Sequence, residues 1–134
     1  MSKHIDLGRL TDALKAVRGL QFAVLFGSAK DGELPREDSD VDVAVSLDHE
    51  PRLEEFAQIV GLIQDAVGSD RVDLVVLRPT GHYTLHREVL KGRLLVCHDP
   101  EAYASFFSLT DRRARDEEAR IVRAWNLRHE LAQS

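Results

Sequence analysis

The amino-acid sequence predicts a mixed α/β (α+β) fold, with a mixed sheet of about four strands, flanking helices and a C-terminal helical extension. Short apolar runs rich in β-branched residues alternate with longer segments in which apolar residues recur every three or four positions. A length of 134 residues and a hydrophobic content of 43% suit one compact domain with a small core. We therefore expect a single domain, residues 1–134, in which helices cover a sheet.

The helices are predicted from the spacing of their apolar residues and from their caps. Asp6 is a typical N-cap for the first, and Gly68 is a typical end for the second. Asp99–Pro100 has the cap and first-position chemistry that starts the last. Thr110–Asp111 is a second cap-like pair, which would split that last helix in two. The helices are predicted at residues 7–17, 53–67 and 83–90 and from residue 100 onward.

The strands are predicted from short runs of valine, leucine and phenylalanine. Valines alternate with other residues at positions 41, 43 and 45, which is typical of a strand. A polar loop that contains Gly32 and Pro35 precedes this run. Strands are predicted at residues 21–26, 41–45, 72–77 and 94–97, and the loop at residues 29–39.

The loop and its flanks, FGSAKDGELPREDSDVDVAV, hold the most informative chemistry. Gly27 and Ser28 end one apolar run, where glycine lets a backbone approach phosphate and serine adds a hydroxyl. Asp40 and Asp42 open the next strand and point to the same face of it. Two adjacent carboxylates repel unless a cation lies between them, and such oxygen ligands suit Mg²⁺ or Mn²⁺. Taken alone, each pair has a second interpretation, as a polar turn at the surface.

A third carboxylate, Asp73, lies within RVDLVVL, which otherwise has the pattern of a buried central strand. An ionised aspartate is seldom buried without a partner. It is either a solvent-facing end residue, the partner of an arginine such as Arg71, or a third metal ligand beside Asp40 and Asp42. A site of that kind, with two metals, serves nucleotidyl transfer.

Composition excludes some classes of function. The formal net charge is −5, which argues against general nucleic-acid binding, because such affinity comes from a basic surface. The single cysteine, Cys97, cannot form an internal disulfide. With no signal peptide and no apolar run of membrane-spanning length in the sequence, we expect a cytoplasmic protein without a membrane partner.

The stretch GSAKDGELPREDSDVDVAV, followed by VDLVVL, resembles the DNA polymerase β-like nucleotidyltransferase superfamily. It is most similar to the minimal nucleotidyltransferases, the MntA-type antitoxins encoded beside HEPN-domain (HepT) toxins, over about residues 7–100. The family pattern has ten residues between Gly-Ser and Asp-x-Asp, whereas this chain has eleven. The resemblance implies that Gly27 and Ser28 bind the triphosphate.

The resemblance further implies that Asp40 and Asp42 hold Mg²⁺ and that Asp73 is the third carboxylate, which helps to activate the acceptor hydroxyl. The implied reaction transfers AMP from ATP to a tyrosine of the cognate HEPN ribonuclease and silences it. Two alternatives stay open: an antitoxin that neutralises its toxin by binding alone, and a nucleotidyltransferase that acts on a small, antibiotic-like acceptor.

The remaining candidates are cations, histidines and a charged tail. Lys30, Arg36, Lys91 and Arg93 would either neutralise phosphate or remain solvated. His82 and His86 have the spacing of a helical metal pair but lack a third ligand, and Arg123 to His129 has a spacing found in HEPN ribonucleases that we take as coincidence. The segment 108–134 is either packed on its own domain or a partner-docking helix anchored by Trp125, whereas Phe106 and Phe107 are expected in the core.

Overall fold

The computed structural model describes residues 3–34, 39–79 and 83–133, and the structural statements below concern these residues. Helices and strands alternate as the sequence predicts. Their bounds are β1 (Lys3–His4), α1 (Leu7–Lys15), β2 (Leu20–Phe26), the 3₁₀ turn η1 (Gly27–Ala29), β3 (Glu33–Leu34), β4 (Val41–Leu47), α2 (Leu53–Val67), β5 (Val72–Val76), α3 (Tyr83–Leu90), β6 (Arg93–Cys97) and α4 (Pro100–Gln133).

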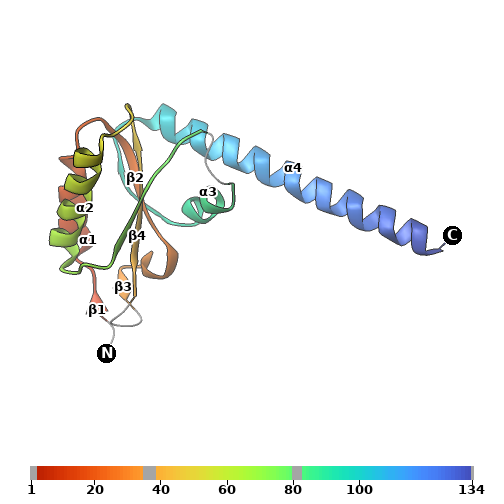
Figure 1. Ribbon diagram of the computed structural model, residues 1–134, viewed down its shortest axis with the longest axis horizontal. Helices are drawn as coiled ribbons and strands as arrows, with labels where there is room; N and C mark the ends of the chain where they lie inside the picture. Colours follow the sequence, from red (N-terminus) through yellow and green to blue (C-terminus); the bar gives the residue numbers. More distant parts are fainter. Residues whose placement is uncertain (1–2, 35–38, 80–82, 134) are drawn as a thin grey trace.

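A mixed, four-stranded sheet in the order β5-β4-β2-β6 forms the centre of the molecule (Figure 1). β2 is antiparallel to both of its neighbours, β4 and β6, whereas β4 is parallel to β5. A separate two-stranded sheet pairs β1 with β3, and β3 lies within the predicted loop, residues 29–39. The sequence pattern misses this pairing because strands of two residues carry no readable alternation. The predicted fold class is confirmed.

Helices cover both faces of the sheet. α1 and α2 pack on one face, where alternate residues of β4, Val41, Val43 and Val45, are fully buried. α3 and the first turns of α4 cover the other face, over Phe22 of β2 and Ala44 of β4. Because side chains of a strand alternate between faces, Asp42 shares this second face with Ala44. The alternation therefore places the carboxylate outside the α1/α2 core.

The caps predicted from the sequence are confirmed. The Asp6 carboxylate accepts a hydrogen bond of 3.0 Å from the backbone N–H of Arg9, at the start of α1. The Asp99 carboxylate accepts one of 3.1 Å from the N–H of Ala102, at the start of α4. Gly68 ends α2 with φ of +69°, in the left-handed conformation that glycine adopts without strain.

The prediction of a break at Thr110–Asp111 is wrong, because α4 is continuous from Pro100 to Gln133. Thr110 is 1% exposed, and its hydroxyl makes no hydrogen bond to any described residue, so it fills space instead of capping a helix. The expectation for the adjacent phenylalanines holds for one of them. Phe106 packs against Phe22, with ring centroids 5.6 Å apart, whereas Phe107 is 47% exposed.

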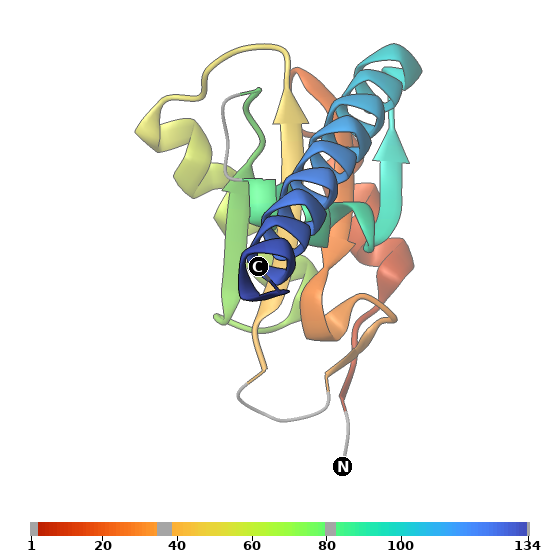
Figure 2. The same ribbon diagram turned by 90° about the vertical axis from the view of Figure 1, so that its right-hand side faces the viewer.

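The C-terminal half of α4 extends away from the sheet (Figure 1). A helix of 34 residues measures about 50 Å. The residues of α4 that pack on the sheet, Ala102, Tyr103 and Phe106, all lie in its first turns. Figure 2, turned toward the C-terminal end, shows α4 in front of the sheet with its end directed away from the strands. No helix among the described residues combines the length and the apolar character needed to cross a membrane.

Candidate functional site

The candidate site lies where β2 ends and β4 begins. In the antiparallel register Phe26 is opposite Asp42, so the residue after Phe26 comes next to the Asp42 side chain. That residue is Gly27, with φ of +75°, and a Cβ atom built on it would overlap the Asp42 carboxylate. Glycine therefore meets two demands here, a left-handed backbone and a close approach to a carboxylate.

Ser28 lies within the single 3₁₀ turn that begins at Gly27, and it is exposed. The N–H of Lys30 closes this turn on the Gly27 carbonyl at 3.3 Å. The turn thus carries the predicted Gly-Ser pair immediately beside Asp42. Because β2 and β4 are antiparallel neighbours, Ser28 and Asp40 lie at the same end of the sheet.

Asp73 is brought beside Asp42 by the parallel pairing of β4 and β5, in which the two residues are direct partners. Adjacent strands are about 4.8 Å apart, and paired residues point to the same face. The expectation that β5 is a buried central strand is wrong. It is an edge strand of the sheet, and Asp73 is exposed. Since solvent reaches it, this aspartate is accessible from outside the domain.

Burial and two neighbouring carboxylates shape the titration of Asp42. Partial burial has the largest effect and raises its pKa above the ordinary 3.8, and the charges of Asp73 and Asp40 raise it further. All three causes disfavour the negative charge at Asp42. A bound cation would relieve each of them, so the electrostatics suit a positively charged ligand.

Asp40 precedes β4 and is paired with an arginine from the neighbouring strand. The Nε of Arg71 donates to Oδ1 of Asp40 at 3.2 Å, and the N–H of Val41 donates to the Arg71 carbonyl at 2.8 Å. The sequence suggests Arg71 as a partner for Asp73, whereas the structure pairs it with Asp40. The register between β4 and β5 determines which aspartate Arg71 can reach, and this register cannot be predicted from the apolar pattern of the sequence.

Two basic residues lie near the Gly-Ser turn. Arg93 at the start of β6 donates from Nε to the Lys30 carbonyl at 3.1 Å, and both side chains are exposed. This contact requires β6 to approach β2 closely, and Gly92 permits the approach because a Cβ there would meet the Leu25 backbone. Lys91 pairs with Glu88 in α3 at 3.4 Å and so has a local role.

The other sequence candidates are placed elsewhere or lie outside the described residues. Arg36 and His82 fall outside them. His86 is 3% exposed, with its ring 5.2 Å from that of Phe106, as expected for a core histidine. In the described part of the chain, no three acidic, histidine or cysteine side chains converge into a ready-made cation site. Asp40, Asp42 and Asp73 thus share one end of the sheet without converging on one point.

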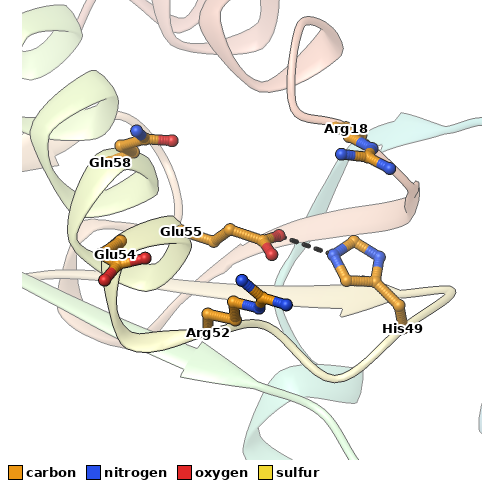
Figure 3. A pocket seen from close by; sticks show the side chains of 6 residues that line it. All are labelled: Arg18, His49, Arg52, Glu54, Glu55 and Gln58. Carbon is orange, nitrogen blue, oxygen red and sulfur yellow. Dashed lines mark hydrogen bonds and ion pairs between the residues drawn. The ribbon is translucent and has the colours of Figure 1, made fainter.

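A cavity of about 440 Å³ lies beyond the opposite ends of β2 and β4 (Figure 3). His49 is one of its lining residues, and its ring nitrogens make hydrogen bonds to the carboxylates of Asp48 at 2.8 Å and Glu55 at 2.7 Å. These hydrogen bonds, first to Asp48 and then to Glu55, raise the pKa of His49. The bridge ties the β4–α2 loop to helix α2, and its distance along β4 from Asp42 separates it from the candidate site.

Gly27→Ala tests the close approach at the site. We expect a loss of about 1–2 kcal/mol in unfolding free energy, because alanine disfavours a positive φ and its methyl group overlaps the Asp42 carboxylate. Urea unfolding measures the change. Gly61→Ala is the matched control, since a Cβ at this position in α2 meets nothing within 4 Å and alanine should stabilise the helix by about 0.5–1 kcal/mol. Equal effects at both positions would contradict the proposed constraint.

Asp42→Asn tests the cost of ionising the partly buried Asp42 carboxyl group. A raised pKa in the folded state means that the favourable contribution is present while the carboxyl is protonated and is lost as pH rises through the folded pKa. At pH 7 and without metal, the variant should therefore melt at a higher temperature than the wild type. The difference should vanish at pH values below 3.8, where the carboxyl is protonated in both states. Asp12→Asn, at an exposed position of α1, is the control; a lower melting temperature for Asp42→Asn at pH 7 would contradict the argument.

The fold resembles several solved structures of toxin–antitoxin complexes. One match, from a mutant MntA–HpeT complex, has a TM-score of 0.72 and 22% identity and covers 91% of this chain and 97% of that chain. A chain from a toxin–antitoxin structure with AMP-PNP has a TM-score of 0.69 at the same identity and coverage. A third comes from a tri-AMPylated Shewanella oneidensis HEPN toxin in complex with MNT antitoxin, with a TM-score of 0.58, 21% identity and coverage of 89% and 95%. At these identities the similarity concerns the fold.

Comparison with curated proteins gave no match. Residues 9–101, well over half of the chain, match the family described as Polymerase beta, Nucleotidyltransferase. The matched range begins in α1 and ends at the start of α4, and it contains the Gly-Ser turn and all three aspartates. The resemblance seen in the sequence is thereby confirmed, and the chain belongs to the polymerase beta nucleotidyltransferase family.

Proposed function

We propose that this protein transfers AMP from ATP to a tyrosine hydroxyl of a cognate HEPN-domain ribonuclease toxin in the cytoplasm, and so acts as its antitoxin. The observation that carries the proposal is the junction of Gly27, Asp42 and Asp73, where two strand pairings bring a phosphate-type turn and two carboxylates to one end of the sheet. We further propose that residues 1–134 work as one domain.

In this proposal Gly27 and Ser28 bind the triphosphate. The support is Ser28, which is exposed within the 3₁₀ turn and whose hydroxyl can donate a hydrogen bond to a phosphate oxygen. Lys30 and Arg93 lie beside the turn, where the Nε of Arg93 donates to the Lys30 carbonyl at 3.1 Å. Their side chains would add positive charge to this side of the site.

Asp40, Asp42 and Asp73 would hold Mg²⁺ or Mn²⁺ on the other side. Their carboxylate oxygens are the donors that these ions prefer, and the raised pKa of Asp42 indicates a site with too little positive charge. When bound, such a metal supplies Lewis-acid stabilisation of the phosphoryl oxygens. Asp73, the more exposed of the two carboxylates at the strand junction, would accept the proton of the attacking hydroxyl. The hydroxyl oxygen would then bond to the α-phosphorus of ATP, and pyrophosphate would leave with the electrons of the broken phosphoanhydride bond.

The acceptor would come from a second protein. β5 is the edge strand and Asp73 is exposed on it, so the described chain leaves this side of the site uncovered. Solved structures of similar fold are named as complexes of toxin and antitoxin, one of them with AMP-PNP and one with a tri-AMPylated HEPN toxin. We extend that pairing, and the use of an adenine nucleotide, to this chain.

The distal half of α4 would be the docking segment for this partner. Ile121 and Trp125 are 60% and 58% exposed, one turn apart, and the Trp125 ring stacks on His129 with centroids 3.8 Å apart. Leu127 and Leu131 are also exposed and one turn apart, on the opposite side of the helix, about 200° around from Trp125. A helix with apolar residues on opposite sides suits insertion between helices of a partner.

Labelled ATP tests the reaction directly. With Mg²⁺ and the HEPN protein encoded beside this gene, we expect label on a tyrosine of that protein. Asp42→Asn and Asp73→Asn should each reduce transfer by about 10²–10³-fold, because the first weakens the hold on the metal and the second removes the group that accepts the hydroxyl proton. Asp12→Asn should transfer at the wild-type rate.

The possible results separate three functions. Complex formation without transfer, together with toxin neutralisation by Asp42→Asn, would show an antitoxin that acts by binding and would overturn the proposed reaction. Transfer to small hydroxyl compounds in the absence of any protein partner would instead show a small-molecule enzyme.

Trp125→Ala tests the docking segment. We expect its binding to the HEPN protein, measured by isothermal titration calorimetry, to weaken about thirtyfold, since a buried interface tryptophan is typically worth about 2 kcal/mol or more. Leu53→Ala is the matched control, because Leu53 is 83% exposed on α2, on the other side of the sheet. Unchanged affinity for Trp125→Ala would place the interface elsewhere.

A further inference from the structure

We infer that Arg71 is an internal counter-ion that holds Asp40 while the site is empty and has to release it when a divalent cation binds. The inference rests on the proposed function, since it treats Asp40 as a metal ligand. It assigns to Arg71 a role in setting the metal affinity of the site, because the guanidinium and the metal ion would compete for the Asp40 carboxylate.

The contacts of Arg71 place it to compete for Asp40. Its Nε donates to Oδ1 of Asp40 at 3.2 Å, and its carbonyl accepts from the N–H of Val41 at 2.8 Å. The backbone bond holds the start of β5 next to the start of β4, so the arginine side chain begins one residue away from the β4–β5 ladder. The guanidinium and a metal ion would therefore claim the same carboxylate from the same end of the sheet.

The arrangement of the acids supports competition. Asp40 lies two residues before Asp42, immediately before β4 begins, so both carboxylates come to the same end of the sheet. Even so, no three acidic, histidine or cysteine side chains of the described residues form a ready-made cation site. Asp42 and Asp73 are fixed by paired strands, whereas Asp40 precedes its strand and is bonded to Arg71. Convergence thus requires Asp40 to change partner.

The ion pair is weak enough to be exchanged. The two side chains are 53% and 52% exposed, so solvent screens their attraction. Exposed pairs of this kind contribute modestly, and their loss corresponds to about a two- to fivefold change in a binding constant. A divalent cation that gains a carboxylate ligand can offset a cost of this size. Arg71 would then lower the metal affinity without preventing binding.

Titration of the metal-free protein, residues 1–134, with Mn²⁺ tests the inference without nucleotide or partner. Electron paramagnetic resonance measures the concentration of free Mn²⁺. Arg71→Gln should bind Mn²⁺ about two- to fivefold more tightly than the wild type, because Asp40 is then free to turn. Asp42→Asn should bind markedly more weakly, which shows that the ion occupies the proposed site.

Two further variants separate competition at Asp40 from a general effect of charge. Arg78→Gln breaks a comparable exposed pair, with Glu50, at the other end of β5 and should leave the affinity unchanged. Arg93→Gln removes a positive charge near the Gly-Ser turn without any bond to Asp40, and should tighten binding less than Arg71→Gln does.

Each other result overturns the inference in a distinguishable way. Weaker Mn²⁺ binding by Arg71→Gln would show that the arginine orients Asp40 for the metal. Equal tightening by Arg93→Gln would show a general charge effect. If the wild type binds no Mn²⁺, or if Arg71→Gln and Asp42→Asn both bind it with the wild-type affinity, the proposed metal site is overturned as well. The assay of AMP transfer to the HEPN protein would then test the proposed reaction separately.

Discussion

The contact between the Gly27 backbone and the Asp42 carboxylate is the constraint on which the site depends. The β2–β4 register places Phe26 opposite Asp42, and the chain must then leave β2 through a turn that runs past that carboxylate. Only a residue without a Cβ passes at this distance, and the positive φ of Gly27 reinforces the requirement. The Gly-Ser turn and the Asp42 carboxylate are therefore neighbours because of one backbone pairing, whatever the length of the loop between Ser28 and Asp40.

The same closeness gathers negative charge at the site, and the charged side chains around Asp42 do not fully compensate it. Burial, Asp73 and Asp40 all raise the pKa of Asp42, so its ionised form opposes folding at neutral pH. The Arg71–Asp40 pair relieves part of this crowding at one edge. Stability lost at a site of this kind is typical where a ligand of opposite charge is to be bound.

The extent to which the sequence predicts this protein differs between local and non-local features. The caps at Asp6 and Asp99 and the left-handed Gly68 are local, and each is confirmed by its hydrogen bond or its φ. The β1–β3 pair, the edge position of β5 and the partner of Arg71 all depend on which strands lie side by side. Apolar periodicity contains no such information. Thr110 shows a further limit, because a residue type that caps helices also fills space within one.

The open side of the site and the uncovered part of α4 are best understood together. A nucleotidyltransferase needs a surface that holds the acceptor hydroxyl beside the nucleotide. Here β5 is the edge strand of the sheet and Asp73 on it is exposed, so the described residues provide no such surface on this side. α4 begins on the same face as Asp42, where Phe106 packs on Phe22, and then extends beyond the domain with Ile121, Trp125 and Leu131 exposed. Large apolar side chains on a projecting helix are unfavourable in water unless something covers them. A partner that packs on this helix would also be held on the face of the sheet that carries Asp42, so in the proposed function one docking event would cover the apolar residues and supply the acceptor.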